Sequence, residues 1–410
     1  MKKVLLFVLM FMFMSVGAYG DVGVNASGSF LFSGNYLKDN KDDSFNLYQR
    51  TRIKFSFIAN EHLKGVLGIQ VGGQRWGEEG LRFNDNMDVN VKTRYAYIDF
   101  GDADFLNTRV GLQQVTLPSI FGSHILNDRF GSILINKDMG FISPTIGYGR
   151  LYDETKLKDD SIDIFMVLLP FYMSNLEITP FGTLTNFGKE LEGKQYQVYH
   201  LGLHNKIDFT PFIIKSDVNY GFTDDDYKQQ GYIIVVSAEY VMNMMTPQLF
   251  GFYETGEKQT YDNTGKSRRM PVIGTEGGDF GPGVGFGGKT TFNDDKLLRH
   301  VLLNYDTSYQ TWQGAIGSVG AGFGLNKISF MDKLSSDFVA FYMKGTNHKD
   351  NVELFNTEDS YYEVNLNNTY MLYDNLALIV ELGYGKVKFE DKVIDNDHLY
   401  RVVSGFGYKF

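Results

Sequence analysis

Basic side chains recur at alternating positions in the first third of the chain. They are Arg50, Arg52, Lys54, Lys92, Arg94 and Arg109. Alternate residues of a β-strand share one face, so these side chains are expected to line a common wall. Like charges crowded on one wall raise the local electrostatic potential and attract anions. The alternative is a solvated face with no special role.

A loop with the sequence LPSIFGSHILND follows at 117–128. We expect it to enter the enclosed space opposite the basic side chains and to bring Asp128 with it. Acidic and basic groups facing each other would create a transverse field at a constriction. Small polar solutes would orient in that field, while apolar solutes would be disfavoured.

A nucleotide-binding pattern occurs in a setting that argues against nucleotide binding. Residues 283–290 read GVGFGGKT and satisfy the P-loop pattern. That motif needs a buried strand before it and a helix after it in a parallel α/β sheet. Here EGGDFGP precedes it, so the glycines are predicted to give a flexible loop its conformations.

The histidines and clustered aspartates do not predict a metal site. His200 and His204 share a strand face, but four residues of strand span about 13 Å, too far for one zinc ion. Both are predicted to be polar groups of the interior. The acidic run 224–226 is predicted to be a solvated turn, with a divalent cation as the alternative.

Enzyme motifs are also missing, because the sequence contains neither G-x-S-x-G nor H-E-x-x-H. A lipase-type barrel would need His124 or His300 as a base, with a serine beside it in space. We therefore expect no enzyme activity, no cofactor and no bound metal.

The segments that carry these residues alternate with period two, as strands do. In 89–97, for example, Val91, Tyr95 and Tyr97 form the apolar set. The same pattern recurs in 44–59, 211–221, 360–372 and 376–385. Charges on one face of so many strands would be costly in a dry core. A water-filled interior, with the apolar faces turned outward, removes that cost.

The last segment, LYRVVSGFGYKF, places four aromatic residues on one face: Tyr400, Phe406, Tyr408 and Phe410. Arg401 and Lys409 fall on the other face. Such a strand looks like the closing strand of a bacterial outer-membrane β-barrel, a class in which this segment is read by the barrel-assembly machinery. An ordinary edge strand is the alternative.

The first 20 residues have the pattern of a secretory signal peptide. Lys2 and Lys3 precede an apolar run over 4–14, and small residues follow up to Gly20. The run is shorter than the roughly 20 residues that a spanning helix needs. We expect cleavage after Gly20, and an uncleaved anchor is the alternative.

Composition and loop lengths complete the expected fold. The chain has Gly 45, Phe 34 and Tyr 26, with Cys 0, as outer-membrane barrels often do. Short connections are predicted at 60–64, 137–140, 243–246 and 373–375, and longer ones at 33–43, 75–88, 152–160, 224–229, 347–359 and 390–397. The prediction is an all-β, transmembrane, antiparallel up-and-down barrel of about 18 strands, or 16, spanning 21–410 as one domain. The Gly-rich stretch 255–309 is expected to be a long extracellular loop that can fold into the lumen.

Several strings resemble the outer-membrane homotrimeric porins of sulfate-reducing deltaproteobacteria. They are RTRIKFSFIANEHLKGVLGI, YAYIDF, RVGLQQVTLPSIFGSHILNDRFG and RRMPVIG, with the best match over about 45–150. The resemblance implies a trimeric general porin that admits small hydrophilic solutes, in which LPSIFGSHILND narrows the pore.

The expected function is therefore a passive channel in the outer membrane of a Gram-negative-type bacterium. The main alternative is a substrate-specific, anion-preferring channel. Two further alternatives are an adhesin or structural barrel and the lipase-type barrel. Expected partners are small solutes and ions, outer-membrane lipid and lipopolysaccharide, the barrel-assembly machinery and two further copies of the chain. The formal charge of −10 argues against nucleic acid.

Overall fold

A computed structural model describes residues 22–38, 42–78, 90–102, 106–123, 125–153, 160–189, 195–224, 228–259, 266–273, 316–351, 355–390 and 398–410. The predicted signal peptide, the GVGFGGKT stretch, His124, His300 and most of 255–309 lie outside these residues. In the described part no helix has the length and apolar character needed to cross a membrane.

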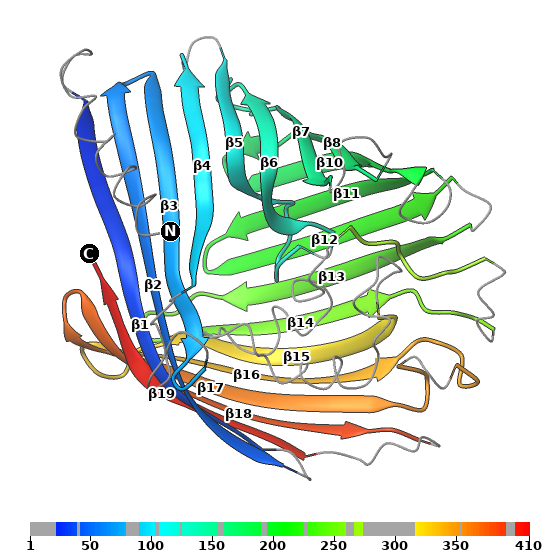
Figure 1. The fold of residues 1–410 in the computed structure, drawn as a ribbon. Coiled ribbons are helices and arrows are strands. Elements are labelled where there is room, and N and C mark those ends of the chain that lie inside the picture. Colours follow the sequence, from blue (N-terminus) through cyan, green and yellow to red (C-terminus); the bar gives the residue numbers. More distant parts are fainter. Residues whose placement is uncertain are drawn as a thin grey trace.

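The described chain folds into a single antiparallel sheet (Figure 1). Its strands are β1 (Gly23–Lys38), β2 (Asp43–Asn60), β3 (Leu63–Arg75), β4 (Val91–Gly101), β5 (Asn107–Thr116), β6 (Asn127–Asn136), β7 (Thr145–Tyr152), β8 (Ile162–Leu168), β9 (Phe171–Met173), β10 (Leu176–Phe187), β11 (Tyr196–Phe209), β12 (Phe212–Thr223), β13 (Gln230–Tyr240), β14 (Thr246–Glu254), β15 (Ser318–Ile328), β16 (Leu334–Gly345), β17 (Ser360–Tyr373), β18 (Leu376–Lys388) and β19 (His398–Lys409).

The sheet closes on itself, because β1 pairs with β2 on one side and with β19 on the other. Strands β8 and β9 both pair with β10, so they are two parts of one strand that is interrupted at Leu169 and Pro170. A proline has no N–H group to give to the ladder. Counted this way, the barrel has 18 strands, and the predicted fold class and strand number are confirmed.

Connections of unequal length gather at the two ends of the barrel. The tight turns at 61–62, 174–175, 210–211 and 374–375 lie at one end, called here the turn end. The longer connections, including those after β3, β12, β16 and β18, lie at the other, called the loop end. The predicted alternation of short and long connections is confirmed, except that 33–43 is not a long connection, because β1 runs to Lys38 and β2 begins at Asp43.

The strands are apolar outside and mixed inside. On β12, for example, Ile214 and Val218 are exposed on the outer surface, while Asp217 and Asn219 are buried in the interior. A layer of exposed apolar side chains around a closed sheet is the arrangement that a lipid environment requires. The alternation predicted for this strand, for β17 and for β18 is confirmed.

One predicted face is wrong, and a β-bulge explains why. The register between β3 and β4 shifts after the pair Gly68 and Tyr95, which leaves Arg94 as an extra residue. A bulge resets the alternation of the strand. Tyr95 and Tyr97 therefore point inward rather than outward, and the guanidinium carbon of Arg109 lies 4.9 Å from the ring centre of Tyr97.

The hydrophobic core lies inside the barrel, on one side. It consists of two chain segments, 117–126 and 266–273, packed against inward-facing side chains of β13, β14, β16 and β17. Leu117, Leu126, Met270, Val272 and Ile273 are all buried. Part of the lumen is therefore filled by the chain itself.

Candidate functional site

The polar side of the lumen is built on strands β2, β3 and β4. Arg52 Nε and Arg94 Nη1 each donate a hydrogen bond to Gln70 Oε1, both at 2.9 Å. The three residues come from three adjacent strands, and the bulge in β4 lets Arg94 reach Gln70. One amide oxygen thus fixes two guanidinium groups side by side, so the positive charge is concentrated on this wall.

Two lysines extend the same wall. Lys54 and Lys92 are exposed to the lumen, and neither makes an ion pair within the described residues. Arg50 lies on the inner face of β2, two residues before Arg52. We call Arg50, Arg52, Lys54, Lys92 and Arg94 the basic wall. The structure brings these five of the six predicted basic residues together.

The sixth, Arg109, belongs to a different group. Its Nη2 lies 2.8 Å from Asp99 Oδ2, and Lys64 Nζ lies 3.5 Å from the same oxygen. Lys64 is six residues from Gln70 along β3, about 20 Å away toward the turn end. Arg109 is therefore paired with a carboxylate nearer the turn end, apart from the basic wall.

The segment 117–126, called here the inserted loop, reaches across the lumen from β5 and β6. Asp217 Oδ2 on β12 accepts hydrogen bonds from Ile120 N at 2.6 Å and Ser119 Oγ at 3.1 Å. The ring of Phe121 packs against Phe250 of β14, with 5.2 Å between ring centres. The loop therefore narrows the lumen by spanning it from one side to the other.

Asp128 comes just after the inserted loop. It lies in β6, opposite Val115 of β5, and its Oδ1 accepts the backbone N–H of Arg129 at 2.6 Å. Strand β6 is only two strands from β4, so Asp128 cannot face the basic wall from across the lumen. The acidic group that meets the loop is Asp217, which sequence reasoning placed only on the polar face of its strand.

The two histidines on β11 hold other parts of the interior. His204 Nδ1 lies 2.5 Å from Asp217 Oδ1, and His200 Nε2 lies 2.8 Å from the carbonyl oxygen of Pro271. The two imidazole rings therefore bind different partners. In the part of the chain that the structure describes, no group of three or more metal-ligating side chains could hold an ion.

A cavity of about 310 Å³ lies beneath the inserted loop, on the side away from the basic wall. Ile120 and Phe121 cover it, and Lys215, Glu239 and Asp337 are among its charged lining residues. Lys215 Nζ lies 2.6 Å from Glu239 Oε1, so these two charges compensate each other. This pair is compensated, in contrast to Lys54 and Lys92 of the basic wall.

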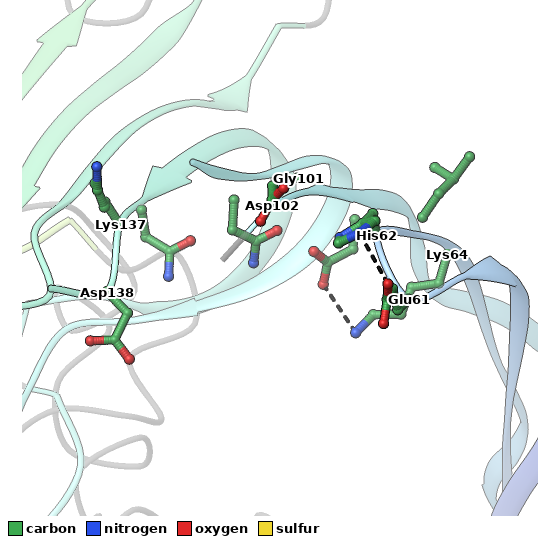
Figure 2. Close-up of a pocket in the computed structure, with 11 residues that line it drawn as sticks. Glu61, His62, Lys64, Gly101, Asp102, Lys137 and Asp138 are labelled. Atoms are coloured by element: carbon green, nitrogen blue, oxygen red, sulfur yellow. Dashed lines mark ion pairs between the residues drawn. The ribbon is translucent and has the colours of Figure 1, made fainter. Parts of the chain in front are cut away.

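A second, more polar cavity of about 420 Å³ opens at the turn end. Figure 2 shows Glu61, His62 and Lys64 on one side of it and Lys137 and Asp138 on the other. Side chains of both charges line it, and two of them, Lys64 and Asp99, form an ion pair. It lies at the rim of the turn end, between the connections that follow β2, β4 and β6.

On the last strand, the inward-facing Arg401 is paired with a carboxylate. Arg401 points inward as predicted, but its Nη2 lies 3.3 Å from Glu381 Oε2 of β18, and both side chains are buried. The partner carboxylate lies on a neighbouring strand. Only the register between β18 and β19 could have revealed this pair.

Solved structures with the same fold are outer-membrane channels. OpdL of Pseudomonas aeruginosa is 11% identical with a TM-score of 0.59, covering 94% of this chain and 98% of its own. OccAB1 of Acinetobacter baumannii is 12% identical with a TM-score of 0.56, covering 94% and 97%. OprD of Pseudomonas aeruginosa is 15% identical with a TM-score of 0.54, covering 94% and 96%.

No protein-family model matches the sequence, and no curated protein matches it. At these identities the structural likeness establishes the fold alone, which is that of an outer-membrane porin barrel. The resemblance to the porins of sulfate-reducing deltaproteobacteria stays a prediction.

Proposed function

We propose that the protein is a passive channel of the outer membrane, through which small hydrophilic solutes and ions diffuse. The observation that carries this proposal is the basic wall, held by Gln70 and facing a lumen that the inserted loop narrows. Transport of this kind needs no cofactor and no bond chemistry. Ions and solutes must bind inside such a channel weakly enough to leave it again.

A substrate-specific, anion-preferring channel is the second candidate. It is favoured by the packed side of the lumen, which leaves the basic wall as the main polar path. Lys54 and Lys92 have no carboxylate partner among the described residues, so their charge is available to a passing anion. A wide, unselective pore would not need such a filled interior.

Conductance across a planar bilayer separates the two candidates. Large conductance that does not saturate with solute supports the general channel. Saturable current, or current blocked by one class of anion, supports the selective channel. Purified protein that inserts but carries no current would contradict both and would favour an adhesin or structural barrel.

The basic wall is tested by the triple variant Arg50→Ser, Arg52→Ser, Arg94→Ser. We expect its reversal potential in a salt gradient to shift toward cation preference, because three inward charges are lost. The matched control is Arg150→Ser on β7, which removes a guanidinium that lies on the outer face beside Asp163. Equal reversal potentials for the triple variant and the native protein would contradict the role of the wall.

We also propose that the barrel is a homotrimer. The outer faces of β5 and β6 support this, because they carry a hydrogen-bonded group of four polar side chains. Asn127 Oδ1 accepts hydrogen bonds from Gln114 at 2.7 Å and Thr116 at 2.6 Å. Arg129 Nη1 donates to Gln114 Oε1 at 3.1 Å. A contact between copies would shield this group from lipid.

The mass of the purified protein in detergent tests the trimer. Native mass spectrometry should show three chains for the native protein and a shift to single chains for Asn127→Leu combined with Arg129→Leu. A native protein that is already monomeric would contradict the proposal. The signal peptide 1–20 and recognition of 400–410 by the assembly machinery remain part of the proposed route to the membrane.

A further inference from the structure

Three lysines project from the outer wall at the loop end of the barrel. They are Lys344 on β16 and Lys386 and Lys388 on β18. Their chain neighbours Met343 and Val387 are buried inside. Because side chains alternate across a strand, the three lysines point away from the lumen.

The strand register brings these lysines together. Lys344 pairs with Ser360 of β17, and Ser360 pairs with Lys388. Neighbouring strands lie about 4.8 Å apart, so one serine hydroxyl sits between two ammonium groups. Lys386 lies two residues from Lys388 on the same face. The result is a compact outward-facing group with three cations and one hydroxyl, called here the lysine patch.

A belt of tyrosines lies next to the patch, closer to the middle of the barrel wall. Tyr342, Tyr362 and Tyr400 are exposed on the same outer face. The Tyr384 hydroxyl lies 3.3 Å from that of Tyr362 and 2.8 Å from His398 Nδ1. Tyrosines take this position where the hydrocarbon of a membrane meets its polar region. The patch therefore lies at the level of lipid headgroups.

Within the described residues, the charge of the patch is only partly balanced. Lys344 and Lys386 make no ion pair among the residues described, while Lys388 pairs with Glu390. Three cations therefore face one carboxylate. A phosphate group complements such a set, because ammonium groups and a hydroxyl all donate hydrogen bonds to its oxygens.

We propose that the lysine patch binds a phosphate of a phosphorylated glycolipid in the outer leaflet. The proposal rests on the outer-membrane location in the proposed function. The cations hold the phosphate, and the adjacent rings of Tyr342 and Tyr362 contact the sugar and the upper acyl chain. A free phosphate ion would use the lysines but would gain nothing from the tyrosine belt.

The test titrates the full chain in detergent with bisphosphorylated lipid A and follows bound lipid by native mass spectrometry. The variant Lys344→Gln, Lys386→Gln, Lys388→Gln should bind on the order of a hundredfold more weakly, from the contribution of each lysine near an anionic surface. The control Lys137→Gln, Lys333→Gln, Lys409→Gln removes the same charge at the turn end. It should bind within about twofold of the native protein.

Two results would overturn the lipid site: equal binding by the patch variant, or equal binding of dephosphorylated lipid A by the native protein. Complete displacement of the lipid by millimolar inorganic phosphate would assign the patch to a free anion instead. Bilayer conductance of the same preparation keeps the proposals apart. If the native protein conducts but binds lipid A and dephosphorylated lipid A equally, only the glycolipid proposal is contradicted. If it prefers lipid A but does not conduct, only the channel proposal is contradicted.

Discussion

The basic wall and the packed side of the lumen differ in the side chains that line them: charged groups facing water on one, close-packed apolar groups on the other. On β2 to β4, arginines and lysines face water, and Gln70 is the shared acceptor that holds two of them. Across the lumen, apolar side chains of the inserted loop and of 266–273 pack against β13 and β14. One ion pair on that side joins Lys215 to Glu239.

The difference teaches that shape and selectivity have separate origins in this barrel. The packed side determines how much of the lumen remains open, because close-packed side chains cannot be displaced without loss of contacts. The basic wall determines which ions favour the remaining path. Substitutions on one side should therefore change pore size and stability, and those on the other should change selectivity.

The largest effect is expected from Asp217→Ala, which removes the anchor of the inserted loop and leaves His204 without its carboxylate. Each buried donor left without its acceptor costs about 1–3 kcal/mol of the free energy of unfolding, and more than one donor loses its acceptor here. Urea unfolding in lipid vesicles should show that loss, and bilayer conductance should rise as the loop detaches.

The control is Asp153→Ala, whose ion pair with Arg150 is exposed. Exposed pairs contribute about 0–1 kcal/mol, so its unfolding midpoint should hardly move. A native-like conductance and stability in Asp217→Ala would show that the loop is held by its apolar contacts alone.

A smaller loss is expected for Phe121→Ala, because this half-buried ring packs on Phe250. Removing it should lower the free energy of unfolding by about 2 kcal/mol and widen the path. The permeability ratio of anion to cation should not change, whereas a changed ratio would contradict the separation of the two sides. Phe165→Ala, which removes an exposed ring from the outer wall, is the control for conductance.

Gln70→Glu sharpens the comparison from the other side. The substitution places a negative charge between Arg52 and Arg94 with almost no change in volume. Unit charges about 4 Å apart in water interact by about 1 kcal/mol, so anion preference should fall by up to roughly fivefold, with unfolding unchanged. Gln49→Glu on the outer face of β2 should leave the reversal potential as it is. The same shift in both variants would show that the effect is not local to the lumen.

The smallest effect concerns the loop end, away from both sides of the lumen. Asp359 accepts the backbone N–H groups of Asn356 at 2.8 Å and Glu390 at 3.2 Å, linking two connections. Burial outweighs the opposing effect of these two hydrogen bonds and, together with the nearby carboxylates of Glu358 and Glu390, raises the pKa of Asp359 to about 6.

The folded state therefore binds this proton more tightly than the unfolded state does. Its contribution to the free energy of unfolding is complete below pH 3.8 and is lost as the pH rises through about 6. Urea midpoints at pH 5 and pH 7.5 should differ less in Asp359→Asn than in the native protein. An unchanged difference would assign the pH dependence to other groups.

The barrel could be predicted from the sequence because alternation is a local property. Each strand such as β12 or β18 shows its two faces without reference to its neighbours, and the turns mark the ends. Tyr97 was placed on the wrong face because the bulge at Arg94 depends on pairing with β3. A single extra residue leaves no mark in the composition of a strand.

The candidate site could be predicted only in part, for a related reason. The basic residues were visible because several lie close together along the chain. Their partners are remote: Gln70 serves β2 and β4, and Asp217 meets a loop 97 residues away in sequence. The neighbours of Arg109 and Asp128 could not be predicted, because they are set by the register of β4, β5 and β6. Contacts across a lumen have no sequence spacing that would reveal them.

The crossing of the inserted loop has a mechanical consequence. A closed sheet seen end-on is a ring that can be squeezed into an ellipse, and the bond from Ile120 to Asp217 acts as a strut across that ring. Lateral pressure on the barrel, such as a change in bilayer thickness applies, is therefore carried to the narrowest part of the path. The width of the opening and the shape of the surrounding ring are tied to each other.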